Sequence, residues 1–549
     1  MRASVSRPRS TSPLTHPRLV SSLRPGALLL PCLVCFLLPH YARCDEPLHA
    51  VQVVLRDVLG KPRAARVTVI DAKGVPRIAE GHATRTLTQG EKYFYAYDSF
   101  VLKVPTGRTQ LRLSGGLELL PLEVFLDVAG PQRVVLSPQR WVNMGVRQWF
   151  SGDSHVHLHT GGPLRVTIEE ALIAAQAEGV NYVNLCVSNN VGDDIRDAEL
   201  ITGTPHPISD AGHLLVFGEE MRSMIYGHMQ FFGIQRLVEP QYTGFENTPN
   251  HLDFPANYTM AKEATEQGGL VTYGHPMFID EPLPYGPDPT AANAAARELP
   301  IDAILGVAHA IDLMSYNSDE TLSTELWYRL LNCGIRLAAS VGTDALLDQD
   351  TNPLGGDRVY VKTNGDLSME NWLEGLRQGR SFVTNGPMLS LQVNGKGPGS
   401  TLDIDANEEL VIHGSVESRL PFTEVELIVD GTVTWTQTEL PASEGIPQVY
   451  HFSTVQPVKA SSWIALRVRG PNHTSLFDGP LWAHTSPVFV HVGGRPIRNA
   501  EDASYFVGWI DQLLRVVQTR DRYPSRPDRE SVEAIFRQAR ERFQERMKE

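Results

Sequence analysis

The stretch Gly152-Asp153-Ser154-His155-Val156-His157-Leu158-His159 decides how the rest of this sequence is interpreted. It follows the apolar and aromatic run at residues 146–150, and alternate residues of a β-strand point to the same side. We therefore expect Asp153, His155, His157 and His159 to share one face. Imidazole and carboxylate together form the mixed nitrogen and oxygen ligand set that Zn, Mn and Fe accept. The pattern predicts the first strand of a metal-binding barrel.

Length and composition describe an ordinary globular chain of several domains. The 549 residues exceed the size of one compact domain, and 42% hydrophobic with 20% charged residues argues against a disordered or fibrous protein. The formal net charge of −14 disfavours nucleic acid or an anionic membrane as the main partner. We expect a small-molecule substrate, no nucleic acid and no membrane-spanning helix.

The N-terminus has the features of a signal peptide. Several arginines precede an apolar stretch at residues 26–39, which is too short to span a bilayer comfortably, and Ala42-Arg43-Cys44 offers a cleavage site. A lipoprotein signal is disfavoured because Arg43 stands where a small residue is needed, and a long disordered tail is the other alternative. We expect export to the periplasm or the extracellular space. After cleavage only Cys186 and Cys333 remain, so no disulfide framework is expected and both thiols are interpreted as inert core residues.

The rhythm of apolar runs divides the chain into an all-β part, a mixed part and a second all-β part. Short strand patterns punctuated by turns fill residues 50–136, and the segment 57–76 resembles a carboxypeptidase-regulatory β-sandwich. From about residue 150 to 385 helix and strand patterns alternate, which indicates parallel strands with helical crossovers. One capping box is expected at Thr167-Ile168-Glu169-Glu170, and residues 303–307 are predicted to be a strand.

All-β patterning returns over residues 388–492, and the tail is helical. In the last segment Val532, Ile535, Phe536 and Phe543 are spaced as a docking stripe. The predicted fold is α/β: a distorted parallel β/α barrel flanked by two β-sandwich domains and a helical C-terminal tail. The predicted divisions are a signal peptide at 1–44, an N-terminal β-sandwich at 45–148, the barrel at 149–387, a C-terminal β-sandwich at 388–495 and the tail at 496–549.

Ligand-type residues recur where later strands of the mixed part end. Each follows an apolar run and lies beside a glycine, where backbone and metal can approach closely, and in a closed α/β barrel such strand ends meet at one rim. Any one of them alone is better explained as a hydrogen-bonded histidine or a helix-capping aspartate. Their coincidence favours a metal site built from these motifs: Gly218-Glu219-Glu220, Gly227-His228, Gly274-His275-Pro276 and Gly342-Thr343-Asp344.

Together with Asp153-x-His155-x-His157, these motifs resemble the PHP (polymerase and histidinol phosphatase) metallohydrolases over residues 150–387. The wider context is most similar to the carbaryl-hydrolase-like CehA/McbA branch, in Arg358-Val359-Tyr360-Val361, in the segment 379–387 and in parts of the following sandwich. The resemblance implies a distorted parallel β/α barrel. It also implies one metal on His155, His157, Glu220 and Asp344, and a second on Glu220, His228 and His275, with Asp153 orienting a ligand histidine.

The chain departs from the PHP phosphatase pattern at the third metal. A Thr-Asp-His after the second strand is replaced by Val187-Ser188-Asn189-Asn190, and the histidine two residues beyond the last aspartate is replaced by Leu346. We expect no ordinary third site, with His159 in a pocket role. Other candidates for the pocket are Asn189, His309, Arg222 and Arg358. His309 could equally be a core residue, and Arg358 could equally form an ion pair with a carboxylate of the barrel.

The sequence supports three functional hypotheses. The first is an exported hydrolase with two divalent ions (Zn, Mn or Fe) and a metal-held hydroxide, acting on an ester, carbamate or amide bond. In this hypothesis His155, His157, Glu220, Asp344 and Asp153 form the catalytic set. The second is a phosphoesterase, on diesters more than monoesters. The third is a catalytically silent binding module, whose β-sandwiches contact glycans or surfaces.

Overall fold

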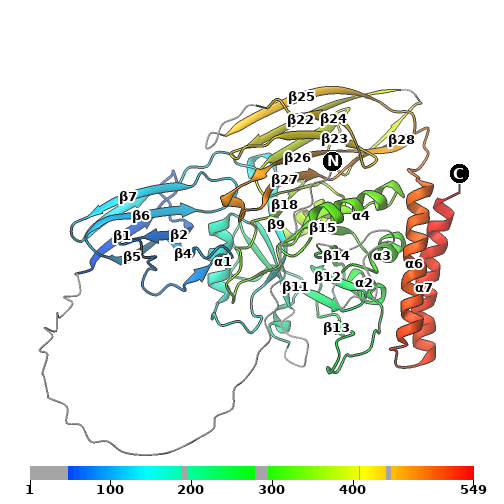
Figure 1. Ribbon diagram of the computed structural model, residues 1–549, viewed down its shortest axis with the longest axis horizontal. Coiled ribbons are helices and arrows are strands. Elements are labelled where there is room, and N and C mark those ends of the chain that lie inside the picture. Colours follow the sequence, from blue (N-terminus) through cyan, green and yellow to red (C-terminus); the bar gives the residue numbers. More distant parts are fainter. Residues whose placement is uncertain (1–46, 188–194, 279–294, 407, 441–446, 549) are drawn as a thin grey trace, which may run out of the picture. The chain divides into compact units, whose positions relative to one another are not determined.

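The computed structural model describes residues 47–187, 195–278, 295–406, 408–440 and 447–548 (Figure 1). Residues from Pro47 onward form one compact unit. The proposed signal peptide and Asn189 lie outside the described residues. The described helices include none with the length and apolar character needed to span a bilayer.

The first part of the unit contains two sheets that enclose one hydrophobic cluster. One sheet has the order β5-β1-β8 and the other the order β3-β4-β2-β6-β7. Val53 and Leu102 of the first sheet pack with Phe94 and Leu111 of the second, and all four are buried. The strands are β1 (His49–Leu55), β2 (Ala64–Ile70), β3 (Arg85–Thr86), β4 (Lys92–Tyr97), β5 (Ser99–Val104), β6 (Gly107–Ser114), β7 (Leu122–Val128) and β8 (Gln132–Leu136).

The central part is mixed α/β, with helices between its strands. Thr167 caps the first helix through the predicted capping box with Glu170, and Gly179 ends it in the left-handed region at φ 64°. The elements are β9 (Trp149–His157), α1 (Ile168–Glu178), β10 (Tyr182–Val187), β11 (Leu214–Ser223), β12 (Gly227–Phe232), β13 (Tyr242–Thr243), α2 (Asn257–Glu266), β14 (Leu270–Tyr273), α3 (Leu299–Leu305), β15 (Ala310–Met314), α4 (Glu320–Asn332), β16 (Ala338–Val341), β17 (Ala345–Leu346), β18 (Arg358–Lys362), α5 (Met369–Arg377) and β19 (Ser381–Thr384).

The central sheet is mixed rather than wholly parallel. Strands β9, β10 and β11 are parallel to one another, and so are β14, β15 and β16, whereas β12 is antiparallel to both β11 and β14. The reason is local: only three residues separate β11 from β12, which is too short for the helical crossover that a parallel pair requires. The expectation of a sheet made only of parallel strands was therefore wrong for this hairpin.

The prediction of a strand at residues 303–307 was also wrong. Those residues fall mostly in α3, which has Pro300 in its first turn and ends at Gly306 with φ 82°. Proline near the start and glycine just past the end are helix signals, and they outweigh the apolar run that favoured a strand. The strand of this unit is β15, which begins at Ala310.

The last part contains a second pair of sheet layers around its own hydrophobic cluster. The sheet β20-β22-β25 faces β23, β26, β27 and β28, and the latter are continuous with the central sheet through the antiparallel pair β19–β27. The elements are β20 (Met388–Val393), β21 (Thr401–Ile404), β22 (Glu409–Ser418), β23 (Glu424–Val429), β24 (Thr432–Gln437), β25 (Gln448–Pro457), β26 (Ser462–Asn472), β27 (Pro480–Thr485), β28 (Val488–Val492), α6 (Ala500–Arg520) and α7 (Arg526–Arg546).

The two C-terminal helices lie side by side and cover α3 and α4 (Figure 1). The predicted docking stripe is confirmed: Val532, Phe536 and Phe543 are buried in the central hydrophobic cluster, and Ile535 packs against it. Cys186 and Cys333 are both buried free thiols, and burial raises the pKa of each, which agrees with the interpretation of them as core residues.

Candidate metal centre

Strand β9 carries two of the candidate ligands, but its side chains do not alternate as predicted. Between the pairs Asp153–Val183 and Val156–Leu185, two residues of β9 (154 and 155) lie opposite one residue of β10 (184), so β9 contains a bulge. An extra residue changes which face the following side chains occupy. His155 and His157 meet at the cluster, with their Nε2 atoms 3.0 Å apart. Strand β9 ends at His157, so His159 lies beyond it.

The hairpin of β11 and β12 supplies two more candidate ligands. In its antiparallel register Glu220 lies opposite Gln230, and Arg222 lies opposite His228. Directly opposite residues share a face and are close, which brings all four side chains together. The Nδ1 atom of His228 is 2.8 Å from Glu220 Oε1, and the Nε atom of Arg222 donates to Glu220 Oε2 at 2.7 Å.

His275 and Asp344 complete the cluster from turns that follow β14 and β16. Both have positive φ, 29° for His275 and 59° for Asp344. Such conformations of non-glycine residues persist only when surrounding contacts hold them, and they gather at functional sites. His275 Nε2 lies 3.7 Å from Glu220 Oε1.

The preceding glycines make room for neighbouring side chains. A Cβ at Gly274 would be 2.2 Å from Gln230 Nε2, and one at Gly342 would be 2.5 Å from His155 Cβ.

The ligand atoms are spaced as an ion would require. His155 Nε2 and His157 Nε2 each lie 3.4 Å from Asp344 Oδ1. His155 Nε2 also lies 3.4 Å from Glu220 Oε1, and His157 Nε2 lies 3.3 Å from Glu220 Oε2. Four ligands arranged tetrahedrally at ~2.0–2.1 Å from an ion lie about 3.3 Å from one another. Two overlapping groups satisfy the spacing of a metal site among the described residues: His155, His157 and Asp344, and His155, Glu220 and His275.

Contacts at the far side of each ring decide which nitrogen of His155 and His157 carries the proton. His157 Nδ1 lies 3.0 Å from the carbonyl oxygen of Cys186, an acceptor that keeps the ring proton on Nδ1. His155 Nδ1 lies 3.1 Å from the amide of Gln230. The contact atom is Gln230 Nε2, so in this orientation the amide N–H donates to Nδ1, whereas the opposite orientation of the amide would present its oxygen and keep the ring proton on Nδ1. A metal at Nε2 of both rings requires that second orientation, in which the two Nε2 lone pairs converge and need a cation between them.

The carboxylates of the cluster are held ionised. Burial favours the neutral form of Glu220, but Arg222, His155 and His228 outweigh it and hold the pKa of this carboxyl well below its usual range. Burial likewise opposes the charge of Asp344, yet His155 and His157 lower its pKa. For His157 burial lowers the pKa, whereas hydrogen bonds to Asp344 and Glu220 raise it, with a net value of about 9. A proton therefore occupies the metal-free cluster at neutral pH.

His228 and His275 each keep one ring nitrogen without a partner. Burial lowers the pKa of His228 to about 4, so its ring is neutral. Neither His228 Nε2 nor His275 Nδ1 has a hydrogen-bond partner among the described residues, and both are buried. Buried polar atoms are nearly always paired, so these two nitrogens suit an additional ligand.

Asp153 acts on the backbone around the cluster rather than on an imidazole. Its carboxylate accepts from the amides of His155 (3.2 Å), Thr343 (3.0 Å) and Gly355 (2.8 Å), and from Thr343 Oγ1 at 2.6 Å. These bonds tie β9 to the turn that carries Asp344. Through the amide of His155 the carboxylate also contacts a candidate ligand, and the expectation that Asp153 orients a ligand histidine stays a prediction.

Three of the predicted pocket residues lie away from the ligand atoms or are already paired. His159 bonds Asp197 Oδ2 through Nδ1 and the Val166 carbonyl through Nε2, both at 2.8 Å. His309 precedes β15 and contacts Val271 at the start of β14, so it is at the opposite strand ends from His275. Arg358 is 1% exposed, and its guanidinium donates to backbone carbonyls of Gly355, Glu178 and Gly179. Of the four candidates that the structure describes, Arg222 alone contacts a cluster carboxylate.

Sequence reasoning missed three residues behind the ligands. Gln230 is two residues after His228, so strand alternation would have identified it. Asn317 donates to Asp344 Oδ2 at 2.7 Å. Asp312, whose pKa burial raises to about 7, accepts from Ser154 Oγ at 2.8 Å, and the misassigned strand at 303–307 concealed it.

The first pair of sheets reaches the loop that follows Asp344. The buried Arg85 of β3 donates to the carbonyl oxygen of Leu347 at 2.7 Å, and the Leu347 amide donates to the carbonyl oxygen of His157 at 2.8 Å. Asp348 accepts from the amides of Thr160 and Gly162 at 2.6 and 2.9 Å. The loop is therefore fixed between β9 and the N-terminal sheets.

Comparisons with known proteins add little to this geometry. No protein family and no curated protein matches the sequence. One solved structure with a detectable likeness is Endonuclease Q in complex with a 27-mer duplex substrate that has an abasic lesion at the active site. The identity is 14%, the TM-score is 0.26, and the match covers 42% of this chain and 56% of the nuclease chain. A likeness of this size establishes neither a fold nor an activity for this chain.

Proposed function

We propose that this protein is an exported metal-dependent hydrolase that acts on an ester, carbamate or amide bond. In this proposal one divalent ion is held by His155, His157, Glu220 and Asp344, and a second by Glu220, His228 and His275. The central sheet would be a distorted β/α barrel of the PHP type, with the domain divisions predicted from the sequence. The observation that carries the proposal is the spacing of 3.0–3.4 Å among nitrogen and oxygen atoms of four buried or half-buried side chains.

The two oxygens of Glu220 support a bridging role. Oε1 faces His155 at 3.4 Å, His228 at 2.8 Å and His275 at 3.7 Å, whereas Oε2 faces His157 at 3.3 Å. Imidazoles therefore lie at both oxygens of this carboxylate. Four imidazoles around one carboxylate are more ligands than a single tetrahedral ion uses, which supports two ions better than one.

The chain's own residues would set the protonation states that such a site needs. Divalent ions bound here lower the pKa of a bound water towards neutrality and polarise the oxygen of a scissile carbonyl or phosphoryl group. The carbonyl oxygen of Cys186 holds the Nδ1 proton of His157, Gln230 contacts His155 at Nδ1, and Asn317 donates to Asp344. Arg222, with 23% of its side chain exposed, is the charged group from which we expect contact with a substrate oxygen.

The test combines elemental analysis of metal per chain with a panel of chromogenic substrates, using the full-length protein. The panel contains carboxylate esters, carbamates, anilides, phosphodiesters and phosphomonoesters. We expect up to two divalent ions per chain and turnover of a carboxylate-derived class. His155→Ala should lose the bound metal and the turnover. His451→Ala, at an exposed position of β25, should keep both.

Each alternative has its own outcome. Turnover that persists in metal-free His155→Ala protein would refute the proposal. Faster turnover of phosphodiesters than of any carboxylate derivative would replace it with the phosphoesterase hypothesis. Metal-loaded protein that is inert towards every class would favour the binding module.

A further inference from the structure

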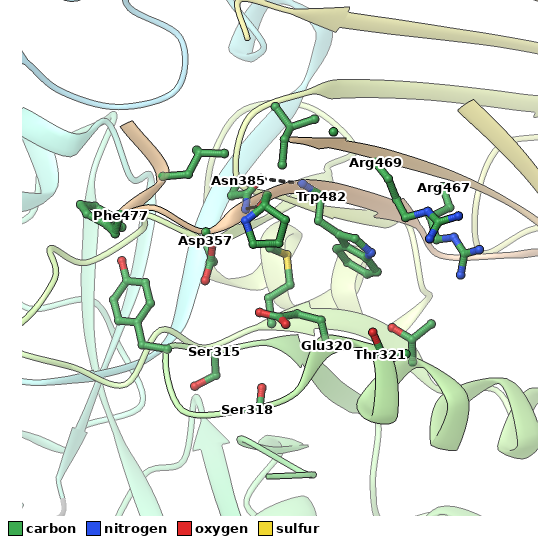
Figure 2. Close-up of a pocket in the computed structure, with 18 of the residues that line it drawn as sticks. Ser315, Ser318, Glu320, Thr321, Asp357, Asn385, Arg467, Arg469, Phe477 and Trp482 are labelled. Carbon is green, nitrogen blue, oxygen red and sulfur yellow. Dashed lines mark hydrogen bonds between the residues drawn. The ribbon is translucent and has the colours of Figure 1, made fainter. Parts of the chain in front are cut away.

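A cavity of about 650 Å³ lies apart from the metal cluster, between the central sheet and the strands β26 and β27. Residues 315–318, which follow β15, and the first turn of α4 form one wall, and β27 forms another (Figure 2). None of the six proposed metal ligands lines it. Its volume is in the range of cavities that enclose small organic ligands.

Two buried hydroxyls that line this cavity have no partner. The side chains of Ser318 and Thr324 are 7% and 4% exposed, and neither hydroxyl oxygen has a hydrogen-bond partner among the described residues. Leaving a hydroxyl buried and unpaired is unfavourable, so such groups usually meet a ligand or water. Ser318 is drawn beneath Glu320 and Asp357 in Figure 2, on the wall that faces Trp482.

The cavity also contains two carboxylates without a cationic partner. Neither Asp357 nor Glu320 forms an ion pair with any described residue, and burial, followed by repulsion from Glu320, raises the pKa of Asp357 to about 8. The cationic residues of the lining are already neutralised: Arg467 and Arg469 contact Glu426 at 2.7 and 2.8 Å, and Arg469 also contacts Glu424 at 2.6 Å. Among the charged side chains of the lining only Asp357 and Glu320 have no ion-pair partner in the described part of the chain, and a cation bound beside Asp357 would lower its pKa and favour the ionised form.

Aromatic side chains flank these carboxylates. Phe477 and Trp482 appear on either side of Asp357 in Figure 2, and Tyr316 contacts Phe477 edge to face with ring centroids 6.0 Å apart. Aromatic faces attract cations and also cover apolar groups. No third metal-ligating side chain joins Asp357 and Glu320 in a metal-sized group within the described residues. The lining thus suits an organic cation better than a metal ion.

We propose that this cavity binds a small organic cation, with its ammonium group at Asp357 and Glu320 and its apolar part against Phe477 and Trp482. The three ammonium N–H groups donate to the two carboxylates and to the unpaired hydroxyl oxygen of Ser318. The site is separate from the proposed hydrolytic centre and does not depend on it.

The test measures binding of phenethylammonium to the full-length protein by calorimetry, beside its neutral counterpart 2-phenylethanol, choline and methyl glucoside. We expect phenethylammonium to bind about tenfold more tightly than 2-phenylethanol. Asp357→Asn keeps the shape of the side chain and should remove that tenfold preference. Trp482→Ala should weaken the binding of both phenyl compounds. Asp403→Asn, at an exposed carboxylate of β21, should leave both affinities unchanged.

Several results would overturn the proposal. Equal affinity for the alcohol and the amine, tighter binding of the glucoside, or no binding of either amine would each do so. Unchanged amine affinity in Asp357→Asn would do the same. Glu220→Ala, which removes a proposed metal ligand, should leave amine binding intact, so failure of the hydrolase proposal is distinguishable from failure of this one. If Trp482→Ala does not fold, the isosteric Asp357→Asn variant still decides the matter.

Discussion

The metal cluster and the cavity both contain two carboxylates removed from bulk water, yet the two pairs are in opposite electrostatic states. Glu220 and Asp344 are surrounded by imidazoles and by Arg222, which outweigh burial and lower the pKa of both carboxyls. Asp357 and Glu320 have no cationic partner among the described residues, so burial raises the pKa of each. Burial alone therefore does not set the charge of a carboxyl. The neighbours supplied by other strands decide it.

The sharpest test of this comparison makes the same change in both regions. Glu220→Gln and Asp357→Asn each replace a carboxylate with an amide of the same shape. We expect Glu220→Gln to weaken metal binding by more than about a hundredfold, because it removes the charge and one coordinating oxygen. Asp357→Asn should leave metal content unchanged. Competition with a chelator measures the metal affinity of both variants. Equal affinity in the two would contradict the assignment of Glu220 as a metal ligand.

A second prediction concerns Gln230, which contacts His155 from behind. Gln230→Leu removes the side chain that contacts His155 Nδ1, and loss of such a contact lowers metal affinity by about 10–100-fold. Gln230→Glu places a carboxylate oxygen there as an acceptor for the Nδ1 proton and should keep most of the affinity. The absorption of the cobalt-substituted protein reports both occupancy and geometry. Wild-type affinity in Gln230→Leu would show that His155 needs no partner at Nδ1.

A third prediction uses pH to test the unpaired state of Asp357. Because its folded pKa of about 8 exceeds the unfolded value of ~3.9, the folded state holds more protons between these values. The contribution of this group to stability is complete below pH 4 and is lost as pH rises towards 8. Asp357→Asn removes that loss.

The free energy of unfolding should be the same for Asp357→Asn and the wild type near pH 4. At pH 8.5 it should be higher for the variant by about 1 kcal/mol or more. Thermal unfolding midpoints measured from pH 4 to 9 for both proteins check this, since other titrating groups are common to the two. A difference that does not change with pH would show that Asp357 is already paired.

The smallest expected effect is at the contact between the N-terminal sheets and the cluster. Arg85→Ala removes the hydrogen bond to Leu347, and we expect the bound metal to dissociate about threefold faster because the loop after Asp344 is held less firmly. Arg108→Ala, at an exposed position of β6, is the matched control. Metal dissociation measured by chelator trapping distinguishes them. Identical rates would mean that the N-terminal sheets do not support the cluster.

Strand-end motifs identified the side chains that gather in the cluster, because the carboxyl ends of neighbouring strands meet at one edge of a sheet. His155, His157, Glu220, His228, His275 and Asp344 lie together as the motifs suggested, although their role as ligands stays a prediction. The same reasoning could not assign the neighbours that set protonation. Gln230 was missed because no strand was predicted at β12, and Asp312 was missed because the strand that carries it was placed at 303–307.

Errors arose where two local signals competed. Residues 303–307 are apolar enough for a strand, but Pro300 and Gly306 mark the ends of a short helix. Because of this error His309 was expected after the end of a strand, whereas it precedes β15. Strict alternation along β9 failed for a different reason. A bulge opposite β10 turns Asp153 towards Thr343 and Gly355, and only the pairing partner reveals where that extra residue falls.

The sequence by itself determined which residue types stand at the strand ends and where the chain changes from all-β to mixed patterning. These features depend on local periodicity and on turn residues close by in the chain. Tertiary structure alone decided which carboxyls are charged and where the bulge falls. It also brought the walls of a cavity together from β15, α4, β26 and β27. Those properties depend on distances between segments that are remote in sequence, and through-space electrostatics and packing set them.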